Sequence, residues 1–135
     1  MVLLGKKFDR KKKFELRRVK RSVINSINGL VSSYHEEQSL LIHFVMSLVV
    51  IFCGIFFKIN RYDWIFSIIL MGLILCIELL NTAIEANVDL VTQNIHPLAK
   101  RAKDVGSSAT FMMSIFAFIG EVIIFYPYFI NYFAK

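Results

Sequence analysis

The sequence contains few charged residues and few cysteines. Charged residues make up only 19% of its 135 residues, against 56% hydrophobic residues, and this balance is too apolar for an ordinary soluble domain. There are only two cysteines, Cys53 and Cys76, and both lie in apolar runs. Two widely spaced cysteines form neither a disulfide framework nor a zinc motif, so we interpret them as small buried side chains. The length favours a single domain, residues 1–135.

Two common phosphate-binding motifs are also absent. The sequence contains no G-x-x-x-x-G-K-[ST] loop and no G-x-G-x-x-G turn, so any nucleotide must be held by another arrangement. The N-terminus does not read as a cleavable signal peptide either. Its basic stretch continues for about twenty residues, with no short apolar core and cleavage site behind it.

Positive charge is abundant but unevenly distributed. Ten of the sixteen Lys and Arg residues lie between Lys6 and Arg21, and the net charge is +6. Such a cluster indicates an anionic partner, either nucleic acid or an anionic membrane leaflet. Long apolar runs follow the cluster directly, so we favour the membrane and expect no nucleic-acid partner.

The hydrophobic pattern predicts an all-α membrane protein with three transmembrane helices and an N-terminal amphipathic surface helix. A basic tail occupies residues 1–13, and residues 14–34 carry apolar side chains at helical spacing, as in a helix lying in the membrane surface. The predicted spans are residues 40–57, 64–90 and 109–128, each close to the roughly 20 residues that cross a bilayer. A polar hairpin separates the first two spans, and a polar loop, residues 92–108, precedes the third.

The distribution of basic residues also predicts an orientation in the plasma membrane. The N-terminal cluster and the cations of the 92–108 loop belong on the cytoplasmic side, which the two crossings between them allow. The hairpin with Lys58 and Arg61 is then outside, as is the C-terminus.

A stripe of polar residues interrupts the second span: Glu78, Asn81, Glu85 and Asp89. At about 100° per residue, these four side chains occupy about 80° of one helix face. Glu78 lies about 21 Å beyond Trp64 along the helix, still within the hydrocarbon, and Glu85 lies near the headgroups. Intramembrane acids are costly and therefore functional candidates, although an interhelical polar network or an ion path would also use them. Glu121 is a further acid, in the third span, that could pair with another helix.

Two further clusters accompany the stripe. Glu36 and Glu37 precede the first span at the predicted depth of Glu85, and a pair of carboxylates from two helices suits Mg²⁺, which takes oxygen ligands and keeps several waters. The polar loop carries Lys100, Arg101 and Lys103, cations of the kind that neutralise a polyphosphate. Three helices cannot easily enclose all these groups, so packing alone favours a homo-oligomer.

The run from Glu78 to Asp89, E-x-x-N-[ST]-A-I-E-x-x-x-D, and the later A-K-D at residues 102–104 closely resemble the signature of the small bacterial diacylglycerol kinase and undecaprenol kinase family. The resemblance extends from about residue 18 to residue 108. It implies a homotrimer with composite active sites between subunits, and phosphorylation of a membrane lipid alcohol with Mg²⁺ and ATP. A small non-enzymatic assembly or channel protein is the alternative from another class.

Roles for individual residues follow from this resemblance. It implies that Glu78 is the general base, that Asn81 helps to position it, and that Glu37 and Glu85 are metal ligands that also contact the nucleotide. The other implied nucleotide contacts are Arg18, His96, Lys103 and Asp104. The resemblance also implies that Ser107 borders the lipid site together with Glu78. Asn25 stands where some members carry a tyrosine near the nucleotide, so that contact is not expected here.

The family has two branches, and this sequence shares features with both. His43 and the His-Pro-Leu-Ala-Lys run at residues 96–100 are similar to the Gram-positive undecaprenol kinases. The Gly-Ser-Ser-Ala run at residues 106–109 is more similar to the diacylglycerol kinases. We therefore expect undecaprenol as the lipid, with diacylglycerol as the alternative.

Overall fold

The computed structural model describes the backbone of residues 2–134 and the side chains of residues 15–34 and 37–134. It divides into two compact units, Met1–Glu36 and Glu37–Lys135, and each is described by itself. The described residues form four helices, named α1 to α4. Three of these helices are long and apolar enough to cross a membrane. The predicted all-α class with three membrane-spanning helices is therefore confirmed.

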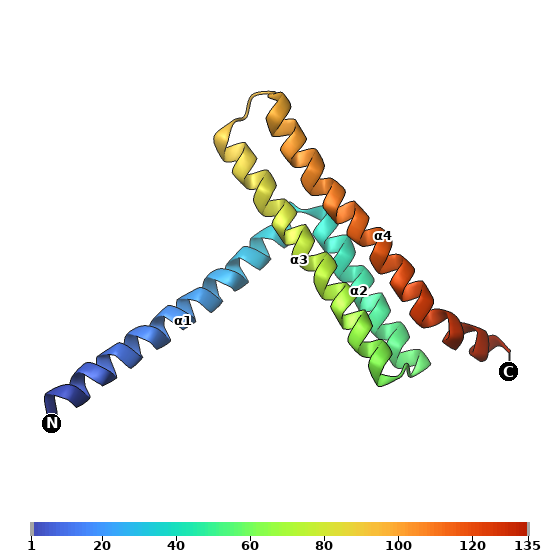
Figure 1. Cartoon of the computed structure of the whole chain (residues 1–135), viewed down its shortest axis with the longest axis horizontal. Coiled ribbons are helices and arrows are strands. Elements are labelled where there is room, and N and C mark those ends of the chain that lie inside the picture. Colours follow the sequence, from blue (N-terminus) through green and yellow to red (C-terminus); the bar gives the residue numbers. More distant parts are fainter. Residues whose placement is uncertain (1, 135) are drawn as a thin grey trace. The chain divides into compact units, whose positions relative to one another are not determined.

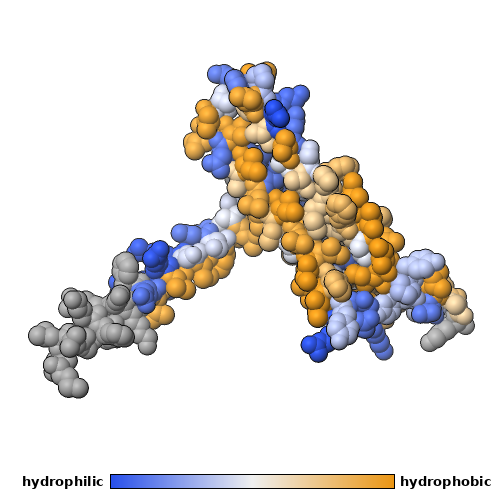
Figure 2. All heavy atoms as spheres, in the orientation of Figure 1, coloured by the Kyte–Doolittle hydropathy of each residue, from blue (hydrophilic) through white to orange (hydrophobic). Residues whose placement is uncertain are grey.

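The first unit is one long helix, α1, which spans Val2–Glu36. Lys, Arg and Leu are good helix formers, and no proline interrupts the segment. The prediction started this helix at residue 14, whereas the helical backbone includes the residues that we assigned to a basic tail. Figure 2 shows hydrophilic side chains along one side of α1 and apolar side chains along another, as expected of a surface helix.

The second unit starts with a helical hairpin. Helix α2 spans Gln38–Phe57 and helix α3 spans Arg61–Val91. Lys58 ends α2 in the left-handed conformation (φ 52°), and the backbone N–H of Ile59 donates to the Gly54 carbonyl at 3.1 Å, a Schellman-type end. Asn60 then caps α3, because its side-chain oxygen accepts from the backbone N–H groups of the second and third helical residues. The cap starts α3 three residues before the predicted position, residue 64.

Helix α4 spans Pro97–Phe133 and follows a short turn. The prediction treated residues 92–108 as a loop, but only residues 92–96 lie outside the helices. His96 and Pro97 explain the difference: the His96 Nδ1 accepts from the backbone N–H of Leu98 at 3.2 Å, and proline suits the first position of a helix. The cations that we predicted on a loop, Lys100, Arg101 and Lys103, therefore have fixed directions on the first turns of α4.

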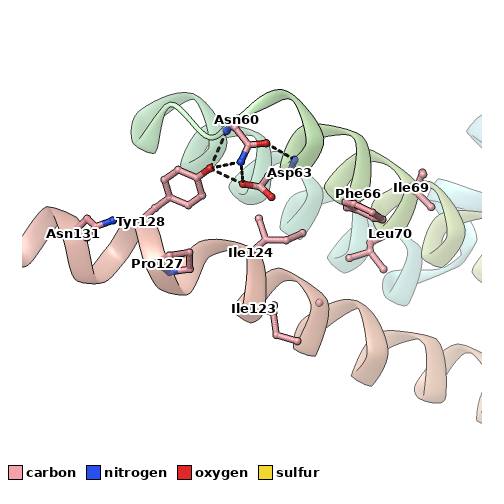
Figure 3. A pocket seen from close by; sticks show the side chains of 11 residues that line it. Asn60, Asp63, Phe66, Ile69, Leu70, Ile123, Ile124, Pro127, Tyr128 and Asn131 are labelled. Carbon is pink, nitrogen blue, oxygen red and sulfur yellow. Dashed lines mark hydrogen bonds between the residues drawn. The ribbon is translucent and has the colours of Figure 1, made fainter.

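The hairpin end of α3 is bonded to the C-terminal part of α4. The Tyr128 hydroxyl accepts from the Asn60 backbone N–H at 3.0 Å and donates to the Asp63 carboxylate, which also accepts from the Asn60 side-chain amide (Figure 3). These bonds lie at the mouth of a groove of about 720 Å³ with mostly apolar walls. We call Asn60, Asp63 and Tyr128 the hairpin cluster.

The helices of the second unit differ in length, and this positions the candidate site. At 20, 31 and 37 residues, α2, α3 and α4 are about 30, 46 and 55 Å long. Figure 1 shows α3 and α4 side by side and extending together beyond the N-terminal end of α2. Figure 2 shows apolar side chains over the middle of this unit and hydrophilic ones at both ends, the distribution expected of a membrane bundle.

Candidate active site

Glu78 is the most deeply placed acid of the polar stripe. It lies on α3, its residue is 3% exposed, and its Oε2 has no hydrogen-bond partner among the described residues. Burying a carboxyl group without a partner is unfavourable, and folded proteins rarely leave such an atom unpaired without a functional reason. A group of this kind can accept a proton or a hydrogen bond from a molecule that enters the site.

Asn81 and Glu85 follow on the same face of α3. The Asn81 Nδ2 donates to the Glu85 Oε1 at 2.9 Å, while the Asn81 Oδ1 is buried and has no partner within the described part of the chain. The resemblance implied that Asn81 positions Glu78. The hydrogen bond that its side chain makes is to Glu85, so a direct role at Glu78 stays a prediction.

Helix α4 comes very close to α3 beside Asn81. A Cβ atom built on the buried Gly106 would collide with the Asn81 Oδ1. A larger residue here would force the Asn81 side chain to move, so glycine allows this close approach, and the start of α4 lies against the middle of the polar stripe. The role of Gly106 is not visible in the sequence, because a glycine within a helix indicates close packing only once its neighbour is known.

Lys103 is paired with the last acid of the stripe. Its Nζ lies 2.7 Å from the Asp89 Oδ1. Lys103 lies before the apolar stretch of α4, and the hydrogen bond to Asp89 raises the pKa of its ammonium group, with further raising contributions from the charges of Asp89, Glu85 and Glu37 and an opposing one from desolvation. Lys103 is therefore cationic at neutral pH, and three acids from α3 and the start of α2 act on it.

Glu37 and Glu85, the predicted metal ligands, come from different helices. Glu37 is the half-buried residue that precedes α2, and Glu85 is half-buried on α3. Both influence the charge of Lys103, which places them in one electrostatic environment. Among the described side chains no three acid, His or Cys groups converge on a single point. Mg²⁺ commonly takes only one or two protein carboxylates beside waters and substrate phosphates, so two acids are chemically sufficient, and the metal role of this pair stays a prediction. The Glu36 side chain lies outside the described residues.

The remaining predicted contacts lie on the surface. His96, Asp104 and Ser107 are exposed at the start of α4 or within its first turns, and the Asp104 backbone carbonyl accepts from the Ser108 hydroxyl. Arg18 is exposed on α1, which belongs to the other unit. Its predicted contact with the nucleotide thus remains a prediction.

A second polar feature lies deeper in the bundle. The Ser67 hydroxyl of α3 donates to the Glu121 Oε2 of α4 at 2.9 Å, so Glu121 does pair with another helix. Glu121 and His43 both line a cavity of about 240 Å³ between α2, α3 and α4. His43, which we used as an indicator of the family branch, therefore faces the interior of the bundle.

Comparison with known proteins gives a consistent result. The family described as prokaryotic diacylglycerol kinase matches residues 24–125. The chain is 34% identical over 113 residues to an undecaprenol kinase of Bacillus subtilis (strain 168), which covers 84% of this chain and 92% of that protein. It is 34% identical over 97 residues to a diacylglycerol kinase of Pseudomonas aeruginosa, covering 72% and 79%, and 30% identical over 104 residues to one of Escherichia coli (strain K12), covering 77% and 85%.

The predicted resemblance is thereby confirmed, and the non-enzymatic alternative is no longer needed to explain acids inside a membrane helix. The family match covers most of the chain, including both its apolar helices and its polar stripe. The chain belongs to the prokaryotic diacylglycerol kinase family, and it is a membrane-bound lipid kinase with ATP as its co-substrate.

Proposed function

We propose that this protein transfers the γ-phosphoryl group of ATP to the hydroxyl group of undecaprenol, with Glu78 as the general base. The observation that carries the proposal is the buried Oε2 of Glu78, which has no hydrogen-bond partner among the described residues and lies about 10 Å along α3 from Glu85. A lipid alcohol has its hydroxyl just below the headgroups, where this oxygen can accept its proton.

The chemical step uses this proton acceptor directly. The lipid oxygen forms a bond to the γ-phosphorus while its proton passes to the Glu78 carboxylate. The bond between the γ-phosphorus and the bridging oxygen breaks, and its electron pair leaves with ADP. A positioned general base contributes about 10²- to 10⁴-fold to such a transfer, and most of the remaining acceleration comes from positioning and charge neutralisation.

Glu37 and Glu85 would hold Mg²⁺, which when bound neutralises phosphate charge and orients the phosphate chain. The Asn81 amide, which donates to Glu85, would limit the rotation of that carboxylate. The fit rests on the donor set: two carboxylates from two helices beside one lysine whose charge both of them influence.

The nucleotide would lie against the start of α4. Lys103 is the cation for its phosphates, and it would exchange Asp89 for them when the nucleotide binds. His96, Asp104 and the Arg18 of α1 are the further nucleotide contacts, and Ser107 borders the lipid. These roles come from the family signature and agree with the exposed positions of the three α4 residues.

The assembly and orientation complete the proposal. A homotrimer would give Glu37, Glu85 and the start of α4 the neighbours of a composite site between subunits. The N-terminus would be cytoplasmic and the C-terminus outside, because basic residues gather at the N-terminus and before the third span. A cysteine introduced at Asn60 should react with an impermeant reagent from outside the cell, and one at Gln93 should not. The reverse pattern would contradict cytoplasmic access of ATP to the site.

The choice of undecaprenol rests on the relative from Bacillus subtilis, of which 92% is covered, and on His43 and residues 96–100. Diacylglycerol is the second candidate, because several relatives carry that name at 30–34% identity. The two lipids differ beside the hydroxyl: diacylglycerol has ester carbonyls that need hydrogen-bond donors or water, whereas a polyprenol has only hydrocarbon.

The two lipids can be compared at equal mole fraction in the same mixed micelles, with purified protein, Mg²⁺ and ATP. We expect the higher kcat/KM for undecaprenol. A clear advantage for diacylglycerol would reject the lipid assignment and leave the kinase activity standing. Failure to phosphorylate either lipid, under conditions where a related kinase is active, would reject the proposed function.

A further inference from the structure

The register between α3 and α4 places Thr110 opposite Glu78. Ser67 of α3 and Glu121 of α4 are hydrogen-bonded. Glu78 is eleven residues after Ser67, and Thr110 is eleven residues before Glu121. Eleven residues are close to three turns at 3.6 residues per turn, so each step returns to the same helix face. Because the two helices are antiparallel, Glu78 and Thr110 stand at one level as Ser67 and Glu121 do.

A second contact between α3 and α4 lies on the other side of the level of Glu78 and Thr110. Gly106 lies one turn before Thr110 on α4, and its position lies against the Asn81 Oδ1, one turn after Glu78 on α3. The two helices are therefore in close contact both above and below the level of Glu78 and Thr110. Thr110 is 8% exposed and Glu78 is 3% exposed, as expected for residues on facing sides.

The hydroxyl of Thr110 behaves differently from other hydroxyls in these helices. Those of Ser47, Thr82, Ser108 and Ser114 each donate to the backbone carbonyl four residues earlier, the usual way for a helical Ser or Thr to satisfy its donor. The Thr110 Oγ1 is buried and has no hydrogen-bond partner among the described residues. Its donor is thus not used by its own helix.

Three unpartnered polar atoms are consequently gathered at this point of the α3–α4 contact. They are the Glu78 Oε2, the Asn81 Oδ1 and the Thr110 Oγ1. A buried polar atom without a hydrogen-bond partner is unfavourable, so a ligand that pairs with these atoms binds favourably. The carboxylate oxygen of Glu78 and the amide oxygen of Asn81 accept hydrogen bonds, and the Thr110 hydroxyl both donates and accepts. A hydroxyl group matches this set, because it donates one hydrogen bond and accepts others.

We propose that Thr110 contacts the hydroxyl group of the lipid substrate, opposite Glu78. This inference rests on the proposed function, because it takes Glu78 as the base. The Thr110 hydroxyl donates to the lipid oxygen, and the lipid O–H donates to the Glu78 Oε2. The lipid oxygen then has one lone pair held by Thr110 and the other aimed at the γ-phosphorus. As it bonds to phosphorus its proton passes to Glu78, and ADP leaves with the electrons of the broken bond.

The test compares two conservative substitutions, one that removes the hydroxyl and one that keeps it. Thr110→Val removes the hydroxyl and keeps the branched shape, and Thr110→Ser keeps the hydroxyl and removes a methyl group. A neutral hydrogen bond is worth about 0.5–1.5 kcal/mol, so kcat/KM for the lipid should fall about two- to twelvefold in Thr110→Val. The KM for Mg-ATP should be unchanged, and Thr110→Ser should retain most of the activity. The melting temperature of Thr110→Val should not fall, because the lost hydroxyl had no partner.

Ser47→Ala is the matched control. Ser47 is equally buried, at 8% exposed, but its hydroxyl already bonds to its own helix, so its loss should leave kcat/KM within about twofold. Unchanged lipid kinetics in Thr110→Val, or an equal loss in Thr110→Ser, would overturn the inference. A loss that appears only in the KM for Mg-ATP would overturn it as well.

This outcome is separable from a failure of the proposed function. If Glu78→Gln abolishes turnover while Thr110→Val is fully active, Glu78 keeps its role and the Thr110 contact is rejected. If Glu78→Gln is itself active, the base assignment is rejected, and with it the inference that depends on it.

Discussion

The two ends of the α3–α4 pair both carry polar residues, but they use them in opposite ways. At the hairpin end, Asn60, Asp63 and Tyr128 bond to one another, so that one hydroxyl, one amide and one carboxylate satisfy each other across two helices. Further toward the other end, Glu78, Asn81 and Thr110 each keep a buried atom that has no hydrogen-bond partner among the described residues. The polar residues at the hairpin end are therefore typical of a structural cluster, and those of the second group are typical of a ligand-binding site.

The difference shows how a structural polar cluster can be distinguished from a functional one in a membrane protein. Both kinds place costly groups in an apolar environment. A structural cluster recovers that cost within the protein, through hydrogen bonds between its members. In a functional cluster some buried polar groups stay without a hydrogen-bond partner until the substrate binds. Substitutions at the hairpin end should therefore affect stability, and substitutions in the other group should affect activity. The following predictions test that separation, from the largest expected effect to the smallest.

The strongest effect is expected from Glu78→Gln. The amide keeps the shape but cannot accept the substrate proton, so kcat should fall by about 10²- to 10⁴-fold while Mg-ATP still binds. Steady-state assays and a nucleotide-binding titration measure the two quantities. Glu121→Gln is the matched control, because that acid is paired with Ser67 and a glutamine can still accept this bond. Turnover above a tenth of the wild-type value in Glu78→Gln would contradict its role as the base.

Glu85→Gln and Glu37→Gln should remove the metal-binding carboxylates. We expect activity to be lost at low Mg²⁺, with any remaining activity requiring a higher Mg²⁺ concentration, since each variant lacks one anionic ligand. A Mg²⁺ titration of kcat measures this requirement. Asp63→Asn, at the hairpin end, should leave the requirement unchanged. If one of the two variants is fully active at low Mg²⁺, that residue is not a ligand.

Two glycine substitutions compare the ends directly. Gly106→Ala would push its Cβ into the Asn81 side chain, and such a displacement beside reacting groups can cost up to about 10²-fold in rate. Gly54→Ala would place its Cβ 2.7 Å from the Trp64 ring at the hairpin end, which should cost about 1–3 kcal/mol of stability. Kinetics and thermal unfolding in the same detergent distinguish the two effects. Equal kcat losses in both variants would contradict the separation of roles.

The smallest effect is expected from Tyr128→Phe. It removes a hydroxyl that bonds with the Asn60 backbone and side-chain amides and with the Asp63 carboxylate, so the free energy of unfolding should fall by about 1–2 kcal/mol. The kcat of the folded protein should not change. A lower kcat at unchanged thermal stability would place the hairpin cluster in the catalytic machinery instead.

Much of the fold followed from the sequence because apolar length and helical periodicity are local properties. The three spans and the face shared by Glu78, Asn81 and Glu85 follow from counting residues along one helix. The predicted third span starts at residue 109, whereas helix α4 starts twelve residues earlier, at Pro97, because the prediction located the apolar stretch and not the whole helix. A polar segment with a histidine cap and a proline at its first position continues that helix into the headgroup region.

By itself, then, the sequence determined a membrane protein with a polar stripe on its second span and the signature of a lipid kinase family. Only the tertiary structure decided which residues of α4 meet that stripe: Gly106 lies against Asn81, and Lys103 pairs with Asp89. The physical reason is that periodicity specifies the faces of a single helix. The register between two helices depends on how their side chains pack together, which no stretch of either helix contains alone.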